Sequence, residues 1–168
     1  MKKYQKFLFV MCLPFFSLNA FAMDIEEGNY RIRCDTRSGG LRSLEAFPTD
    51  DAVRPRIDSA TQDQKWTLKS TRSGYYTLSC FTKNGGVRYL EAFPRKEIVR
   101  PRAESRDQDQ EWSLTPWSTK SVDAGIYRIG CSTKNGGDRC LEAFPKDDVV
   151  RPSVESLDQD QMWQLIRW

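Results

Sequence analysis

The 168-residue chain contains no histidine, which removes the side chain most often used as a general base and as a metal ligand. It also lacks an excess charge. The chain has 26 basic and 23 acidic residues, but Lys2, Lys3 and Lys6 lie in a leader-like segment, which leaves 23 of each sign. Nucleic-acid binders carry a basic excess on one face or run. We therefore expect no nucleic-acid partner.

Long hydrophobic runs are scarce as well. The longest, residues 7–16, is too short to span a bilayer as a helix. It follows the three lysines and precedes Ala20-Phe21-Ala22, the small-x-small pattern of a signal-peptidase site. We predict a signal peptide over residues 1–22, export to the periplasm or the outside, and no membrane span. The remaining chain, 23–168, has the size of a single domain.

This remaining chain consists of three copies of one pattern, the feature to look for before any local one. Each copy begins with Gly-x-Tyr, has a cysteine six residues after the glycine, and continues with Leu-Glu-Ala-Phe-Pro and Val-Arg-Pro. Each copy closes on Asp-Gln-x-Trp-x-Leu, with the tryptophans at Trp66, Trp112 and Trp163. The predicted copies span about 23–69, 70–119 and 120–168, with a five-residue insertion within 115–124.

Each copy alternates apolar and polar residues with a period of two, which is typical of strands. Tyr30-Arg31-Ile32-Arg33-Cys34 is one example. A Gly-rich turn follows, Asn135-Gly136 in the third copy, and Asn-Gly predicts a two-residue hairpin. The Leu-Glu-Ala-Phe, Val-Arg-Pro and Gln-x-Trp-x-Leu segments supply three further strands. The sequence thus predicts an all-β chain of twelve short strands, in which the copies share one core because a single copy cannot bury its apolar face.

The three copies favour a pseudo-threefold barrel with a hairpin cap, because propellers need at least four blades to close. Gln64-Lys65-Trp66, Gln110-Glu111-Trp112 and Gln161-Met162-Trp163 resemble the QxW signature of the ricin B-chain-like β-trefoil family. The resemblance covers essentially all of residues 23–168. It implies a β-trefoil fold and a carbohydrate-binding function.

The resemblance also implies a site in each copy. In sugar-binding members, an acid after the conserved leucine accepts hydrogen bonds from sugar hydroxyls, an aromatic residue stacks on the ring, and a polar residue beside the QxW glutamine assists. Here arginines stand near the stacking position, a departure that suits an acidic sugar better than galactose-type stacking. The predicted ligand-binding residues are Glu45, Arg54, Asp63, Gln64, Glu91, Arg100, Asp109, Gln110, Glu142, Arg151, Asp160 and Gln161.

The same residues have a structural interpretation of equal weight. Each Glu and Arg would form a charge-assisted pair that holds one hairpin, while Asp and Gln satisfy backbone groups. The closing tryptophans are expected in the core. Aromatic stackers for a sugar would then be Phe47, Phe93, Phe144, or Trp117 in the insertion.

The cysteines test the predicted hairpin. If Asn135 and Gly136 are the two loop residues, Cys131 faces Cys140 across the strands, within disulfide reach, and we predict that bridge in an exported protein. Cys34 and Cys80 have no such partner. They are either buried thiols, which we prefer, or a bridge across the pseudo-threefold axis.

The favoured function is a secreted carbohydrate-binding module that takes a glycan or glycoprotein, either alone or as the receptor-binding component of a toxin with a partner subunit. The alternative is a protein-binding β-trefoil, an inhibitor or complex subunit without a sugar site, whose binding free sugars would not compete. We expect no enzyme, cofactor or metal site, because the chain has no histidine and no nucleophile beside an evident base.

Overall fold

The computed structural model describes residues 25–71, 75–105, 107–118, 125–134 and 136–168; the predicted signal peptide lies outside them. These residues form twelve antiparallel strands, four in each copy. None of the helices formed by these residues has the length and apolar character needed to cross a membrane. The strands are β1 (Gly28–Thr36), β2 (Gly40–Phe47), β3 (Ala52–Arg56), β4 (Trp66–Ser70), β5 (Tyr76–Thr82), β6 (Gly86–Phe93), β7 (Ile98–Arg102), β8 (Ser113–Pro116), β9 (Ile126–Thr133), β10 (Gly137–Phe144), β11 (Val149–Ser153) and β12 (Trp163–Arg167).

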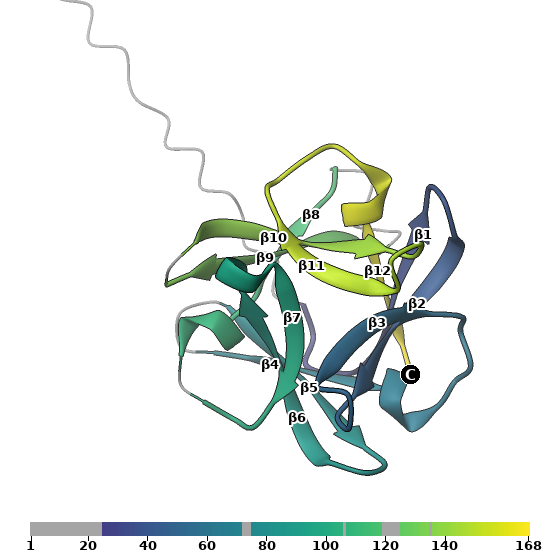
Figure 1. Ribbon diagram of the computed structural model, residues 1–168, viewed down its shortest axis with the longest axis vertical. Helices are drawn as coiled ribbons and strands as arrows, with labels where there is room; N and C mark the ends of the chain where they lie inside the picture. The colour runs from purple at the N-terminus through teal and green to yellow at the C-terminus, as the bar shows by residue number, and fades with distance from the viewer. Residues whose placement is uncertain (1–24, 72–74, 106, 119–124, 135) are drawn as a thin grey trace, which may run out of the picture.

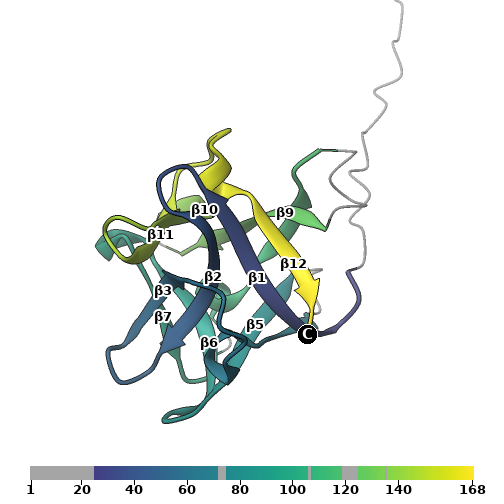
Figure 2. The same cartoon turned by 90° about the vertical axis from the view of Figure 1, so that its right-hand side faces the viewer.

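Six of the strands close a barrel. The pairs β1–β4, β4–β5, β8–β9, β9–β12 and β12–β1 are hydrogen-bonded, and the Tyr76–Trp112 bridge joins β5 to β8. The other six strands form the hairpins β2–β3, β6–β7 and β10–β11. They form the cap, with β3, β7 and β11 around the centre of the molecule in Figure 1 and to one side of the barrel in Figure 2. The predicted β-trefoil, twelve strands in three pseudo-threefold copies, is confirmed.

The apolar residues of the alternating pattern face the core, as predicted. In the first copy Tyr30, Ile32 and Cys34 are buried, as are their equivalents in the other two copies. The closing tryptophans Trp66, Trp112 and Trp163 have no exposed surface. Each indole nitrogen donates a hydrogen bond to the carbonyl oxygen of the strand leucine in its own copy, at 2.7 to 2.9 Å. The tryptophans are therefore core residues, as predicted.

The fourth strand begins later than predicted. The motif glutamines lie in single 3-10 turns, η1 (Gln62–Gln64), η3 (Gln108–Gln110) and η4 (Gln159–Gln161), and the sheet pairing starts at the tryptophan. A further 3-10 turn, η2 (Pro94–Lys96), follows β6. The turn carries the glutamine side chain into the interior, where all three glutamines are buried.

The hairpin loop is one residue longer than Asn-Gly predicted. In the third copy Thr133 pairs with Gly137, and Gly137 has the positive φ of 65°; Asn135 itself lies outside the described residues. The threonine hydroxyl of each copy donates to the carbonyl oxygen of this second glycine, at 2.7 to 2.9 Å. Three-residue loops that end on a left-handed glycine are a common alternative to the two-residue turn.

The first glycine of each pair is required by the neighbouring copy. A Cβ on Gly136 would lie 2.5 Å from the Cβ of Pro94. The equivalent distances are 2.6 Å between Gly39 and Pro145 and 2.7 Å between Gly85 and Pro48. The proline of the Leu-Glu-Ala-Phe-Pro motif therefore packs on the turn of the next hairpin. The residues of the turn alone do not predict this contact between copies.

The longer loop changes the cysteine register. Cys140 lies opposite Gly130, and Cys131 lies opposite Arg139. The predicted direct pairing of Cys131 with Cys140 is therefore wrong, and both residues are free thiols in the structure. Cys34 and Cys80 are buried free thiols, the preferred expectation for them.

Candidate functional site

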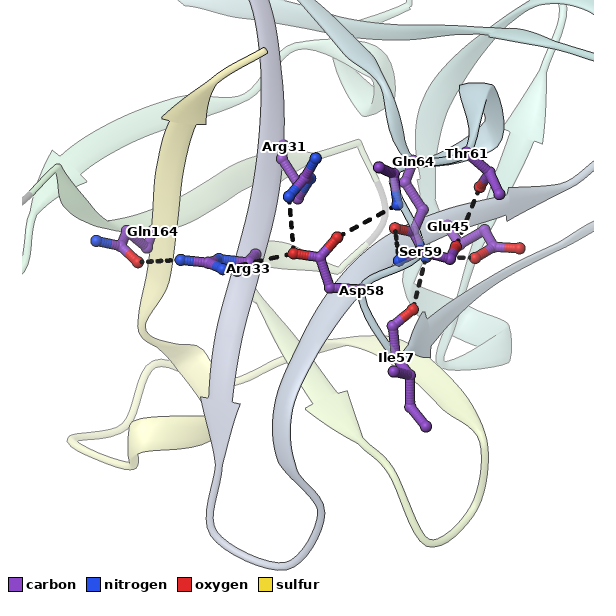
Figure 3. Close-up of polar contacts among 10 residues, drawn as sticks. Arg31, Arg33, Glu45, Ile57, Asp58, Ser59, Thr61, Gln64 and Gln164 are labelled. Carbon is purple, nitrogen blue, oxygen red and sulfur yellow. Dashed lines mark hydrogen bonds and ion pairs between the residues drawn. The ribbon is translucent and has the colours of Figure 1, made fainter.

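The predicted glutamine and glutamate are joined in one network, shown for the first copy in Figure 3. The side-chain nitrogen of Gln64 donates to Glu45 at 2.6 Å and to the carbonyl oxygen of Ile57 at 2.9 Å. Its side-chain oxygen accepts from the backbone nitrogen of Ser59 at 3.0 Å. The buried amide thus has its hydrogen-bonding capacity used within the protein, and it holds the loop after β3 against β2.

The same network occurs in the other copies. Gln110 bonds to Glu91, Ala103 and Ser105 at 2.5 to 2.8 Å. The third copy has equivalent bonds at 2.8 to 3.0 Å between Gln161 and Glu142, Val154 and Ser156. In the first copy the loop is held further by Asp58, which pairs with Arg31 at 2.8 Å and Arg33 at 3.4 Å (Figure 3).

The predicted aspartates bind the turn of the next copy. Asp63 accepts a hydrogen bond from the backbone nitrogen of Lys83 at 2.9 Å. Asp109 does so from Lys134 at 3.0 Å, and Asp160 from Arg37 at 2.8 Å. The Asp-Gln pair of the motif therefore satisfies backbone groups, which is the structural role considered for it above.

The predicted glutamates and arginines are brought together on one hairpin but do not pair. Glu45 lies directly opposite Arg54 in the β2–β3 register, and the other two copies share this arrangement. The glutamate accepts from the glutamine, whereas Arg54 forms ion pairs with Asp50 at 2.9 Å and Asp148 at 3.3 Å. The expected Glu–Arg ion pair is absent among the described residues, although the expected proximity is present.

The arginines instead link one copy to another. We call the contact between the third and first copies the first junction. There, Asp148 of the third copy pairs with Arg54 and with Arg56, the latter at 2.8 Å. Both guanidinium groups lie over the Phe47 ring, 5.0 and 5.1 Å from its centroid. Asp148 has a φ of 56°, which an aspartate tolerates better than most residues. This acid is a functional position that our sequence reasoning missed.

The second junction, between the first and second copies, repeats this arrangement. We call the set of one acid paired with two arginines over a phenylalanine ring the lock. Asp51 of the first copy pairs with Arg100 at 2.6 Å and Arg102 at 2.9 Å. The two guanidinium groups each lie 5.4 Å from the Phe93 ring centroid. The recurring acid after Phe-Pro at 51, 97 and 148 was the sequence signal that could have identified the lock.

The third junction, between the second and third copies, lacks the lock. Ser153 replaces the second arginine, and only Arg151 lies over the Phe144 ring, at 4.8 Å. Arg151 pairs within its own copy, with Asp147 at 3.1 Å. Glu97 and Ser153 make no side-chain hydrogen bond and no ion pair among the described residues.

Surface hollows lie at two of these junctions. The first, of about 410 Å³, is lined by Arg42, Glu45, Phe47, Pro55, Arg56, Ile57, Pro145 and Asp148. The third-junction hollow, of about 250 Å³, is lined by Pro94, Glu97, Arg139, Phe144, Arg151, Pro152, Ser153 and Val154, all equivalent to residues of the first hollow except Arg151. Each combines a half-buried phenylalanine ring with charged groups from two copies. Of the predicted set, Glu45 and Arg151 line these hollows, whereas the Asp and Gln residues do not.

The buried thiols are poorly suited to act as nucleophiles. Burial raises the pKa of Cys80 and Cys131 to about 12 and that of Cys140 to about 11, and it raises that of Cys34 as well. Thiols with raised pKa values are poor nucleophiles at neutral pH. The described residues contain no group of three or more cysteine, aspartate or glutamate side chains placed to hold a metal ion.

No family model and no curated protein matches this sequence. Solved structures do match its fold. The designed threefold-symmetric protein ThreeFoil is 20% identical with a TM-score of 0.63, covering 83% of this chain and 99% of that one. SeviL, solved bound to the asialo-GM1 saccharide, is 17% identical with a TM-score of 0.62, covering 84% and 98%.

Two larger proteins contain a similar unit. A GlcNAcα1-4Gal-releasing endo-β-galactosidase from Clostridium perfringens is 19% identical with a TM-score of 0.63, over 82% of this chain and 32% of that one. A mosquitocidal holotoxin is 14% identical with a TM-score of 0.66, over 86% and 18%. At these identities the similarities establish the β-trefoil fold.

Proposed function

We propose that the protein is a saccharide-binding module without enzymatic activity, and that its site is the hollow at the third junction. The observation that supports this is the missing lock. Phe144 has one guanidinium over its ring where Phe47 and Phe93 have two. Glu97 and Ser153 are free to bind a ligand in the structure.

The chemistry of this hollow suits a sugar. A phenylalanine ring offers a flat apolar face to the C–H side of a sugar ring. The Glu97 carboxylate accepts hydrogen bonds from hydroxyls, the Ser153 hydroxyl donates and accepts, and the guanidinium of Arg139 donates. Binding pockets typically combine such an apolar surface with a few convergent polar groups. The saccharide seen with SeviL and the sugar substrate of the galactosidase support this proposal by analogy.

The test is a glycan array with the chain from residue 23 onward and variants of the third junction. Phe144→Ala and Glu97→Gln remove the stacking face and the acceptor. Ser153→Arg installs the residue found at the two locked junctions, so it blocks the hollow with a side chain that this fold already accommodates. All three variants are expected to lose the same glycans, namely those that the unmodified protein binds at this hollow.

A matched control comes from the first junction. Arg56→Ser there removes one of the two arginines over Phe47 and leaves the third junction unchanged, so binding should be retained or increased. If Ser153→Arg keeps every glycan that the unmodified protein binds, the assignment of the site is contradicted.

The protein-binding alternative is favoured by the first and second junctions, where arginines and not aromatic residues occupy the surface above the phenylalanine. A folded protein that binds no glycan would support this alternative. Its partner would then be another protein, such as the remaining subunit of a toxin, a possibility raised by the holotoxin similarity.

Export is part of the same proposal, since glycan partners lie outside the cell. The basic residues, the apolar run and Ala20-Phe21-Ala22 support it. Mass spectrometry of the exported fraction should find an N-terminus at Met23. An intact residue 1 in all of the protein would contradict export by this route.

A further inference from the structure

We propose a second binding site on the side of the barrel, a groove that takes an acidic saccharide. The Trp168 groove, as we name it, is lined by Asn29, Ala60, Gln62, Lys65, Thr67, Phe81 and Trp168 and has a volume of about 480 Å³. This volume lies within the usual range for small-ligand pockets, roughly 300 to 1,000 Å³. The groove shares no residue with the junction hollows and does not depend on them.

Two exposed aromatic side chains, from different copies, line the groove. Trp168 follows β12, and its backbone nitrogen donates to the carbonyl oxygen of Asn29 on β1 at 2.9 Å; Figure 2 shows this end of β12 beside the start of β1. Phe81 comes from β5 of the second copy. Their exposed fractions are 43% for Trp168 and 58% for Phe81. Exposed aromatic side chains around a polar floor commonly mark a binding surface.

The fold does not require Phe81. The residues at its equivalent positions are Asp35 in the first copy and Ser132 in the third, and both strands form normally. The aromatic side chain therefore has no general role in the barrel. A large apolar residue at only one of three equivalent exposed positions indicates a role in binding at that position.

A hydrogen bond that recurs elsewhere is missing at this groove. Gln108 donates to the carbonyl oxygen of Ser132 at 2.8 Å, and Gln159 donates to that of Asp35 at 3.0 Å. Gln62, their equivalent, makes no side-chain hydrogen bond among the described residues. Its amide is thus left to bind hydroxyl groups of a ligand, together with the side-chain nitrogen of Asn29, whose oxygen already accepts from Thr67 at 2.8 Å.

The charge of the groove selects an anion. The Lys65 ammonium lies 5.7 Å from the Trp168 ring centroid and has no acidic partner among the described ion pairs. Arg31 also lies over this ring, at 4.9 Å, and pairs with Asp58 at 2.8 Å, a carboxylate that it shares with Arg33. The equivalents of Lys65 are Glu111 and Met162, so the uncompensated positive charge is specific to this groove. A sugar ring between the aromatic side chains would place a carboxylate or sulfate on Lys65.

The experiment compares variants taken from the other copies on an array of neutral, carboxylated and sulfated glycans. Phe81→Ser and Lys65→Met introduce the residues of the third copy, and Trp168→Thr introduces the residue of the first, so the fold already tolerates each of them. Leu157→Ser, which removes a fully separate exposed side chain, is the control. Affinities of the unmodified protein and of every variant for the best acidic glycan and its neutral counterpart are then measured by isothermal titration calorimetry, which needs no tryptophan as a probe.

The unmodified protein is expected to prefer acidic glycans. Phe81→Ser and Trp168→Thr should each weaken this binding by roughly tenfold or more, the equivalent of losing one good contact. Lys65→Met should weaken acidic binding by about tenfold while leaving neutral binding unchanged. The control should change nothing.

Two results would overturn the proposal: no acidic glycan bound by the folded protein, or acidic binding that survives in Trp168→Thr. Acidic binding lost in Trp168→Thr but retained in Ser153→Arg would support the groove as a separate site, and the junction site would then be judged by whether Ser153→Arg loses any other glycan. The reverse pattern would refute the groove and leave the junction proposal standing.

Discussion

The polar contacts made by the closing motif are the same in all three copies, whereas the contacts at the junctions and in the Trp168 groove differ from copy to copy. Each motif glutamine bonds to its glutamate, each tryptophan to its leucine carbonyl, and each aspartate to the next turn. At the surface, by contrast, one junction has lost its lock and one groove has gained aromatic residues. What recurs threefold holds the fold, and what departs from threefold symmetry is available for function.

The largest effect expected from the interior concerns its thiols. Burial raises the pKa of Cys80 and Cys131 from 9.0 to about 12, and it raises that of Cys34. The folded state therefore retains these protons at pH values where the unfolded chain loses them. Stability should be constant below pH 9 and fall by about 1 kcal/mol per pH unit and per thiol as the pH rises toward 12.

Urea unfolding at pH 8 to 11 measures this slope. Replacing Cys34, Cys80 and Cys131 by alanine should flatten it strongly, and Cys80→Ala alone should remove about a quarter. The slope that remains belongs to Cys140, whose pKa burial raises to about 11, and to Tyr30, Tyr89 and Tyr127, whose pKa burial also raises. An unchanged slope in the triple variant would contradict the assignment to thiols.

The next largest effect tests the role of the motif glutamine. Gln110→Ala removes bonds to Glu91, Ala103 and Ser105 and leaves their polar groups without partners. The expected loss is about 2 to 3 kcal/mol of unfolding free energy in urea. Gln64→Ala and Gln161→Ala should lose the same amount. A variant that keeps its stability but loses glycan binding would instead restore the ligand role that the resemblance implied.

The turn glycines give a smaller effect with two separable causes. Gly85→Ala forces a Cβ to 2.7 Å from Pro48, at an expected cost of about 1 to 2 kcal/mol. Gly86→Ala meets no neighbour but requires a φ of 67°, at about 1 kcal/mol. Adding Pro48→Ala should rescue part of the first loss and none of the second. Thermal unfolding of the three single variants and the two double variants completes the two double-mutant cycles, and equal rescue of both glycines would refute the distinction.

The sequence predicted the fold well because the fold depends on features that repeat. Alternation, three cysteines, three tryptophans and three Gly-rich turns all indicate the same twelve strands. The hairpin register was missed because it depends on Pro48, Pro94 and Pro145, each of which packs on a turn of another copy. No local turn rule contains that contact.

The candidate site was predicted less well for the same reason. Glu45 and Arg54 are opposite each other as expected, but the acid that pairs with Arg54, Asp148, comes from a different copy. The Trp168 groove likewise combines three copies. Polar partners across a junction become evident only when the copies are assembled, whereas the apolar pattern within a copy is local.

The smallest effect comes from the lock itself. Asp51→Asn breaks ion pairs to Arg100 and Arg102, and because all three side chains are partly exposed the loss should stay below about 1 kcal/mol. It should vanish in about 1 M salt, where the Debye length is only about 3 Å. Glu97→Gln, at the junction without a lock, should leave the thermal midpoint unchanged. If both variants behave alike, the three junctions are equivalent and the comparison fails.

Ser153→Arg makes the opposite change, because it restores the second arginine of the lock at the third junction. The new arginine should reach Glu97 as Arg56 reaches Asp148, and it should raise stability by a few tenths of a kcal/mol at low salt. The same change should abolish glycan binding at the third junction. A gain in stability combined with a loss of binding would mean that the protein keeps one junction open at the expense of stability, as expected where function and stability compete for the same residues.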